Sequence, residues 1–184
     1  SDGGHEAVDL LIRYGATVSL KTGRSSSALL MAAEAGSVDA VEVLLGAGAD
    51  MDIDALDARG YSALHMAVEN RHRGVSQLLL DHGANVLVPR RNHWTCVLTA
   101  AYYGVTDVLQ LLVEHSADVN ATFKSGKKDT SQLVDSFAPA HLAAYKGFES
   151  TLVELGRLGA DVNQTMGNGW SPLMVAAAQG QAHA

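Results

Sequence analysis

The residues best suited to chemistry in this chain are two histidines, one cysteine and a short lysine-containing segment. His65 and His141 could bind a metal ion or move protons, Cys96 could act as a nucleophile, and residues 125–128 (Ser-Gly-Lys-Lys) resemble part of a phosphate-binding loop. A metal site needs further His, Cys, Asp or Glu residues at ligand spacing, and a phosphate-binding loop needs an upstream glycine. Neither pattern is present in the sequence. We therefore predict no catalytic residues, no metal site and no cofactor, and we expect that the chain is not an enzyme.

His65 and His141 instead belong to a phrase that recurs along the chain. The phrase begins at residues 27, 62, 95, 138 and 171, so successive copies are 35, 33, 43 and 33 residues apart. A second phrase, Gly-Ala or Ser-Ala, begins at residues 15, 48, 83, 116 and 159, with spacings of 33, 35, 33 and 43. Two markers with one shared period indicate stacked copies of a single structural unit.

Each unit has the signals of two short helices. A Ser or Thr at residues 27, 62, 95 and 171 is suited to cap the first helix by accepting a bond from a backbone N–H group. The second helix carries an apolar stripe, such as Val41, Leu44 and Leu45, and a glycine follows it where a left-handed residue ends a helix. A unit of this size cannot bury its own apolar surface, so the units must stack.

These residues resemble the ankyrin repeat, whose units open with Thr-Pro-Leu-His-x-Ala-Ala and close with Gly-Ala-Asp-Val-Asn. Residues 118–120 and 161–163 both read Asp-Val-Asn, and His65 and His141 stand at the histidine of the opening phrase. The resemblance covers essentially the whole chain. It implies an all-α fold, an ankyrin-type solenoid of stacked helix-turn-helix units joined by β-hairpin-like loops. In such a stack each histidine ring bonds neighbouring backbone and ties adjacent turns together.

We predict that residues 1–184 form a single array. Its units are a partial repeat 1–20, repeats 21–54, 55–88 and 89–121, a repeat 122–164 with a ten-residue hairpin insertion, and a partial repeat 165–184. The insertion is either a finger that reaches towards a partner or a tolerated surface loop. Both ends carry apolar side chains, so we expect a fragment of a longer array; trimming of the chain ends is the alternative.

Composition limits the classes of partner and compartment. The net charge of −7 argues against nucleic acid, and the basic stretches 89–91 and 124–128 are expected to be solvated loop tips. No apolar run is long enough to insert into a membrane, and no signal peptide is recognisable. With Cys96 as the lone cysteine, we expect a cytoplasmic or nuclear location.

The resemblance places partner binding on the concave side, at the hairpin tips and the exposed part of the first helices. Seven of the ten aromatic residues fall at recurring positions there, and aromatic side chains dominate interface hot spots. For Tyr61, Phe137 and Trp170, packing between adjacent hairpins is an equal alternative. The cluster of Trp94, Tyr102 and Tyr103 is predicted to be the centre of the binding face. The predicted partner-binding residues are Tyr61, Glu69, Asn70, Arg91, Asn92, Trp94, Tyr102, Tyr103, Phe137, Tyr145, Lys146 and Trp170.

The predicted function is a protein–protein interaction module within a larger protein, with flanking repeats or domains of the same parent. The alternatives are a structural or regulatory ankyrin array of a channel, a cytoskeletal linker or a ubiquitin-ligase substrate receptor, and, less favoured, a regulatory segment attached to an enzyme. The resemblance also implies that Asn120 and Asn163 are candidate hydroxylation sites, with a leucine eight residues before each. Their alternative role is to bond backbone in the hairpin.

Overall fold

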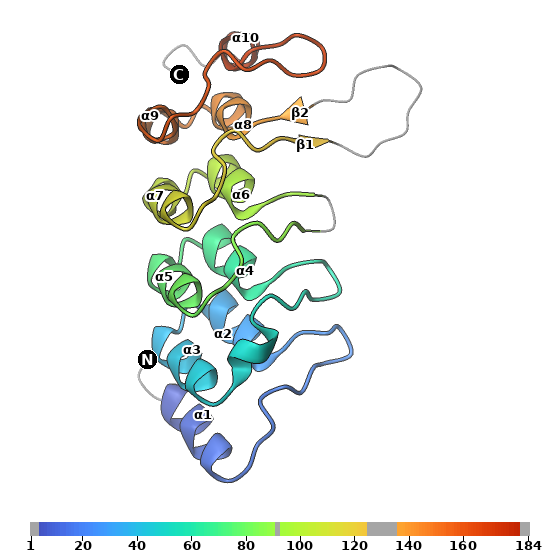
Figure 1. The fold of residues 1–184 in the computed structure, drawn as a ribbon, viewed down its shortest axis with the longest axis vertical. Helices are drawn as coiled ribbons and strands as arrows, with labels where there is room; N and C mark the ends of the chain where they lie inside the picture. The colour runs from blue at the N-terminus through green and yellow to red at the C-terminus, as the bar shows by residue number, and fades with distance from the viewer. Residues whose placement is uncertain (1–3, 91–92, 125–135, 181–184) are drawn as a thin grey trace. The chain divides into compact units, whose positions relative to one another are not determined.

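The computed structural model describes residues 4–90, 93–124 and 136–180, without the side chains of residues 50, 51 and 124. The chain divides into two compact units, Ser1–Arg91 (unit 1) and Asn92–Ala184 (unit 2). In both, the described secondary structure is almost entirely helical (Figure 1). This confirms the predicted all-α fold class of stacked helix-turn-helix repeats.

Unit 1 contains two complete helix pairs and one further helix. The first helices of the pairs, α2 and α4, pack on each other, and the second helices α3 and α5 do the same, so that two columns form (Figure 1). Helix α1 extends the second column by packing on α3. The elements of unit 1 are α1 (Gly4–Arg13), α2 (Ala28–Ala35), α3 (Val38–Gly46), the 3-10 helix η1 (Ala49–Asp52), α4 (Ala63–Glu69) and α5 (Arg73–Asp81).

Unit 2 repeats this arrangement. The first helix α8 contacts both α6 and α10, and the second helices α7 and α9 contact each other. Strands β1 and β2 pair antiparallel, with Phe123 opposite Phe137. The elements of unit 2 are α6 (Cys96–Tyr103), α7 (Thr106–Glu114), β1 (Phe123–Lys124), β2 (Ser136–Phe137), α8 (Pro139–Lys146), α9 (Glu149–Arg157) and α10 (Pro172–Ala178). Most of the predicted insertion falls on residues 125–135, which lie outside the described residues, and the single array over 1–184 stays a prediction.

Three of the four predicted caps form, and one does not. Ser27, Ser62 and Ser171 each accept a hydrogen bond from the backbone N–H three residues later, at 3.3–3.4 Å. Thr95 precedes α6 in the same extended conformation, but its hydroxyl makes no capping bond. Threonine is the poorer cap, and its branched side chain has fewer rotamers available than that of serine.

The apolar stripes of the second helices form the cores of both units. Leu45, Leu79 and Leu112 are buried, as predicted. The first helices meet through alanines, which let their backbones approach closely; these are Ala33, Ala67, Ala101 and Ala144. The glycines that follow the second helices are left-handed, with φ between 86° and 94° at Gly15, Gly48, Gly83 and Gly159. Ser116 takes the same place with φ 72°, which is costly for a residue with a side chain.

The hairpins ahead of α4 and α10 are closed by the same backbone bond. Asp57 N–H donates to the Tyr61 carbonyl at 2.9 Å, and Met166 N–H donates to the Trp170 carbonyl at 2.9 Å. The residue directly before the aromatic one has a positive φ, as at Gly60, Gly169 and His93. Each aromatic side chain is therefore held at a fixed point immediately before a helix.

Candidate partner-binding surfaces

The predicted binding residues fall into two groups, one in each unit. In unit 1, Tyr61 lies between two guanidinium groups, with Arg59 Cζ 5.1 Å and Arg90 Cζ 4.5 Å from its ring centre. Its ring also meets that of His65 edge to face, 6.5 Å away. Burial raises the pKa of the Tyr61 hydroxyl. These contacts match the alternative that Tyr61 packs between hairpins.

The predicted position of Arg90 in unit 1 is wrong. It was expected to be a solvated loop tip, but only 9% of it is exposed, and its Nη1 donates to Glu69 Oε2 at 3.0 Å. The predicted partner-binding residue Glu69 thus holds Arg90 against Tyr61. A buried charge needs such a partner, because it has lost its hydration. Arg90 and Glu69 together fix one side of the Tyr61 ring.

Asp57 fixes the hairpin that carries Tyr61. Its carboxylate accepts bonds from the backbone N–H groups of Arg59 and Tyr61, both at 2.9 Å, and from Arg59 Nε at 2.8 Å. Burial opposes ionisation, but the hydrogen bonds from Tyr61 and Arg59 outweigh it and hold the pKa of the Asp57 carboxyl below its usual range. Hydrogen bonds and ring contacts among Asp57, Arg59, Tyr61, Glu69 and Arg90 therefore hold the Tyr61 side chain in place.

The remaining predicted binding residues in or next to unit 1 are Asn70, Arg91 and Asn92. The Asn70 side chain folds back on its own helix, where Nδ2 donates to the Met66 carbonyl at 2.9 Å. Arg91 and Asn92 lie outside the described residues.

Unit 2 holds a row of rings that contact one another. Trp94 meets Tyr102 edge to face at 5.1 Å, and Tyr102 meets Tyr103 in the same manner at 5.2 Å. On its other side Trp94 contacts Phe123 at 5.3 Å, and Phe123 stacks on Phe137 at 6.0 Å. Edge-to-face and stacked pairs are the favourable aromatic geometries. The structure thus brings Trp94, Tyr102 and Tyr103 together as predicted.

Two side chains of α8 extend this row. Lys146 Nζ lies 4.2 Å from the Tyr102 ring centre and 5.8 Å from that of Tyr145, which is 46% exposed. Trp170 is 42% exposed, and no aromatic contact is recorded for it among the described residues. We call Trp94, Tyr102, Tyr103, Phe123, Phe137, Tyr145 and Lys146 the aromatic face.

Phe123 was missed by the sequence analysis. It does not stand at the position before a capping residue, and it joins the row through strand pairing with Phe137. The only signal in the sequence is an aromatic residue at the start of the extended hairpin. Phe137 is packed by this pairing, as its alternative reading had it.

The histidines serve the stack. His141 Nδ1 accepts from the Ala138 N–H at 3.2 Å, and its Nε2 donates to the Trp170 carbonyl at 3.1 Å. The ring is therefore neutral, and burial lowers its pKa. His65 Nδ1 lies 2.9 Å from the Ser62 hydroxyl. Among the described residues no group of His, Cys, Asp and Glu side chains could hold a metal ion.

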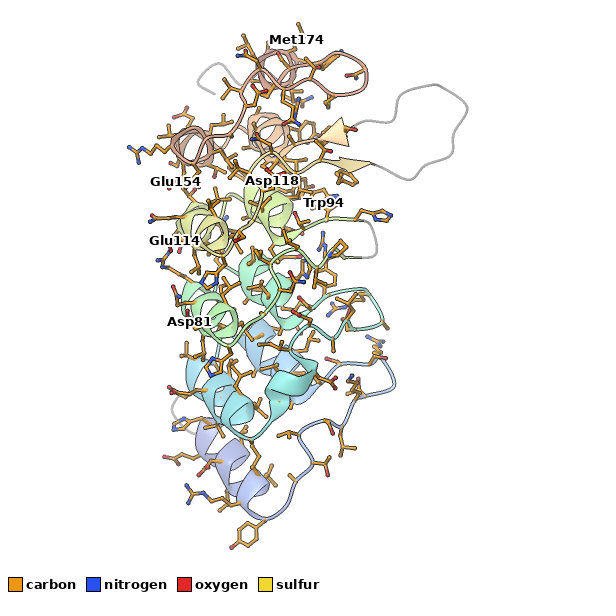
Figure 2. All side chains as sticks on the ribbon, viewed as in Figure 1. Asp81, Trp94, Glu114, Asp118, Glu154 and Met174 are labelled. Atoms are coloured by element: carbon orange, nitrogen blue, oxygen red, sulfur yellow. The ribbon has the colours of Figure 1, made fainter. Side chains whose placement is uncertain are left out.

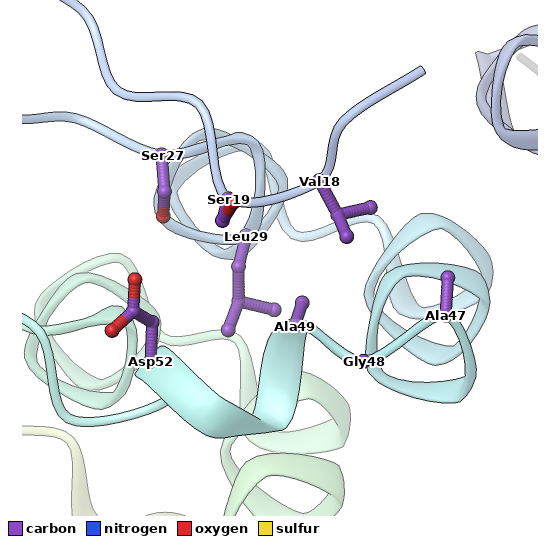
Figure 3. A pocket seen from close by; sticks show the side chains of 8 residues that line it. All are labelled: Val18, Ser19, Ser27, Leu29, Ala47, Gly48, Ala49 and Asp52. Atoms are coloured by element: carbon purple, nitrogen blue, oxygen red, sulfur yellow. The ribbon is translucent and has the colours of Figure 1, made fainter. Parts of the chain in front are cut away.

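Unit 1 also contains an open pocket of about 480 Å³ beside α2 and η1 (Figure 3). Its walls are mostly small side chains, and its one carboxylate, Asp52, lies 3.0 Å from Lys21 Nζ. The eight lining residues include no nucleophile with an adjacent base, which acid–base chemistry would require.

The two asparagines of the closing phrase differ in their engagement. Asn120 Oδ1 accepts from the Asp161 N–H at 2.8 Å, and Gln164 Nε2 lies 3.4 Å from the Asn120 carbonyl. Asn120 thus bridges consecutive hairpins, as its alternative reading had it. Asn163 is exposed, and its backbone N–H donates to Asp161 Oδ1 at 2.9 Å.

Comparison with known proteins identifies the class. The family model for ankyrin repeats (3 copies) matches residues 1–90 and 50–123, so the chain belongs to the ankyrin-repeat family. Ankyrin repeats are protein-interaction modules. No helix in the described part of the chain has the length and apolar character needed to cross a membrane.

Relatives with this likeness are diverse. The chain is 28% identical to the mouse B-cell lymphoma 3 protein homolog over 93% of its length and 37% of the relative's. It is 31% identical to a Caenorhabditis elegans transient receptor potential cation channel subfamily A member 1 homolog, over 82% of the chain and 11% of the channel. It is 38% identical to human ankyrin repeat and SOCS box protein 6, over 55% of the chain and 24% of that protein. The chain thus spans well under half the length of each.

Proposed function

We propose that this chain is a protein-binding segment of a larger cytoplasmic or nuclear protein and that it grips its partner through the aromatic face of unit 2. The supporting observation is that Trp94, Tyr102 and Tyr103 support one another at 5.1–5.2 Å while each stays partly exposed. Rings fixed in this way lose little freedom on binding, so their contacts add more affinity than those of mobile side chains.

The packing in unit 1 favours unit 2 as the centre of binding. The Tyr61 ring contacts both Arg59 and Arg90 and is only partly exposed, whereas Tyr145 and Trp170 in unit 2 are each more than two fifths exposed. Exposed Tyr and Trp beside a supported cluster is the composition of an interface hot spot. The hairpin tips around Trp170 then contribute the rim of the contact.

The test is selection of a displayed random peptide library on the purified chain. Trp94→Ala and Tyr103→Ala should each weaken binding of the selected peptides by about 2 kcal/mol, the cost of losing a hot-spot residue. Tyr14→Ala is the matched control, because Tyr14 is 84% exposed and lies in the turn after α1, outside the aromatic face. Circular dichroism of each variant verifies folding.

If both face variants are folded and bind selected peptides as tightly as Tyr14→Ala does, the aromatic face is not the binding surface. Selection of no peptide above background would also count against the proposal. Trp94→Phe keeps a ring beside Tyr102 and provides a second measurement where the alanine variant unfolds.

We further propose that, of the two candidate hydroxylation sites, Asn163 is the one open to modification. Its side chain is exposed, whereas the Asn120 amide oxygen already accepts the Asp161 N–H at 2.8 Å. Peptide mass spectrometry of the protein from its own cells should show a gain of one oxygen atom on the peptide with Asn163. A gain confined to the Asn120 peptide would contradict the assignment.

A further inference from the structure

The acidic side chains that the structure describes in unit 2 lie outside its aromatic face. Figure 2 shows Glu114 and Glu154 on α7 and α9, on the side of the unit away from Trp94. Every described acidic residue of unit 2 lies on a second helix or in the turn that follows one: Asp107, Glu114, Asp118, Glu149, Glu154 and Asp161. The first helices and hairpin strands that carry the rings present no described carboxylate.

Lys146 is the charged residue that this face does carry. Its ammonium group sits over the Tyr102 ring at 4.2 Å, and no described carboxylate lies within ion-pair distance of it. The other described lysine or arginine of unit 2 with a placed side chain behaves differently: Arg157 Nη1 lies 3.6 Å from Glu154 Oε2 on the same helix. Lys146 therefore offers a partner a positive charge that pairs with none of the carboxylates described in unit 2.

The position of Lys146 has a structural explanation as well. It lies in the last turn of α8, where a positive charge interacts favourably with the helix dipole. The helix dipole accounts for a basic residue at this place. It does not account for the direction of the side chain, whose ammonium group lies over the Tyr102 ring. A cation over an aromatic ring still presents donors on its outer side.

We propose that the aromatic face binds an extended acidic peptide segment, in which an Asp or Glu carboxylate pairs with Lys146 and an apolar side chain two residues away packs on Trp94. The proposal rests on the protein-binding function given above and names the chemistry of the partner. The contacts of 4.2 Å and 5.1 Å through Tyr102 keep Nζ within about 9 Å of the Trp94 ring, and side chains two residues apart on a strand lie about 7 Å apart on one face.

Other partners fit this face less well. Nucleic acid binding draws most of its affinity from many Lys and Arg contacts with phosphates, whereas the aromatic face has one described cation and the chain has a net charge of −7. A basic peptide would place its charge beside Lys146 without a described acid to receive it. The acids of α7 and α9 slow the approach of an acidic partner but lie away from the contact itself.

The test uses the peptides selected from the random library on the wild-type chain. The expected result is enrichment of Asp or Glu two residues from an aliphatic or aromatic residue, relative to the unselected library. Lys146→Glu should abolish this enrichment. Arg157→Glu makes the same change of charge on an exposed part of α9, away from the rings, and should leave the enrichment intact.

A titration sharpens the test. Replacing the selected acid by its amide should weaken binding to the wild type by about five-fold, the scale of a partly exposed ion pair. The same replacement should leave binding to Lys146→Gln unchanged. Selected peptides that depend on Trp94 and Tyr103 but carry no acidic preference would overturn this inference and leave the proposed function standing. An acidic preference that survives Lys146→Glu would overturn the inference too. Failure of the wild-type chain to select any peptide would contradict both this inference and the proposed function.

Discussion

Gly36 and His72 form the most sharply testable contact between two repeats. Gly36 ends α2 in the left-handed region, at φ 73°, and a Cβ atom there would lie 2.5 Å from two atoms of the His72 ring. The same ring holds its Nε2 3.1 Å from the Glu34 carbonyl in the last turn of α2. Gly36→Ala must therefore push the ring away and break a bond that links α2 to the start of α5.

The size of the effect follows from two separable costs. Alanine in the left-handed region costs about 1–2 kcal/mol. Loss of the bond from His72 to Glu34 adds about 1 kcal/mol, the usual net contribution of a hydrogen bond. Gly36→Ala should therefore lower the free energy of unfolding by about 2–3 kcal/mol in the wild type. In a His72→Ala background, where no ring is displaced, the same substitution should cost only the backbone share.

Urea denaturation followed by circular dichroism measures both values, and their difference is the coupling energy, expected to be about 1 kcal/mol. Native-state hydrogen exchange of the α2 and α4 amides shows that the loss is local to unit 1. Gly83→Ala is the control, because Gly83 has φ 86° and open space around the added Cβ. The reasoning is refuted if Gly36→Ala costs the same with and without the His72 ring.

Two further predictions concern the stability of unit 2. Ser116→Gly should raise the free energy of unfolding by about 0.5–1 kcal/mol, because Ser116 stands at φ 72° where four repeats have glycine; urea denaturation measures it, and no gain would contradict the strain. Burial lowers the pKa of His141 below its ordinary value of 6.5, so the unfolded chain binds more protons than the folded chain just below that pH. The contribution of neutral His141 to the free energy of unfolding is therefore complete above pH 6.5. It is lost as the pH falls towards the pKa of the folded state, by at most about 1.4 kcal/mol per pH unit. Tryptophan fluorescence in urea at pH 7.5 and 5.5 should show this loss in the wild type, and an equal loss in His141→Gln would rule out His141 as its source.

The repeat period was sufficient to predict most of the fold. The caps at Ser27, Ser62 and Ser171 and the buried Leu45 and Leu79 follow from positions within one repeat, because each repeat makes the same contacts with its neighbour. The glycines after the second helices were predictable for the same reason. Positions within a repeat thus carry most of the information about local structure and burial.

What could not be predicted depends on pairs of residues in different repeats. Arg90 was expected in solvent because its own stretch is basic, but Glu69, twenty-one residues earlier, supplies the partner that lets it be buried. Phe123 joins the aromatic face by contacting Trp94, which lies in the preceding repeat. The sequence spacing predicted that Trp94, Tyr102 and Tyr103 lie together. The position of Lys146 over the Tyr102 ring could be seen only in the structure.

The residue before a first helix holds its hairpin together through the backbone and leaves its side chain for other contacts. There the structural work falls to the backbone: the Trp170 carbonyl accepts from Met166 N–H and from His141 Nε2, and the Tyr61 carbonyl accepts from Asp57 N–H. Because these bonds use main-chain atoms, closure of the hairpins at Tyr61 and Trp170 does not depend on which side chain stands there. Tyr61 in unit 1 contacts Arg59 and Arg90, Trp94 in unit 2 contacts other rings, and both side chains stay partly exposed. Under the proposed function, recognition would use the side chain of this residue, whereas hairpin closure uses its backbone carbonyl.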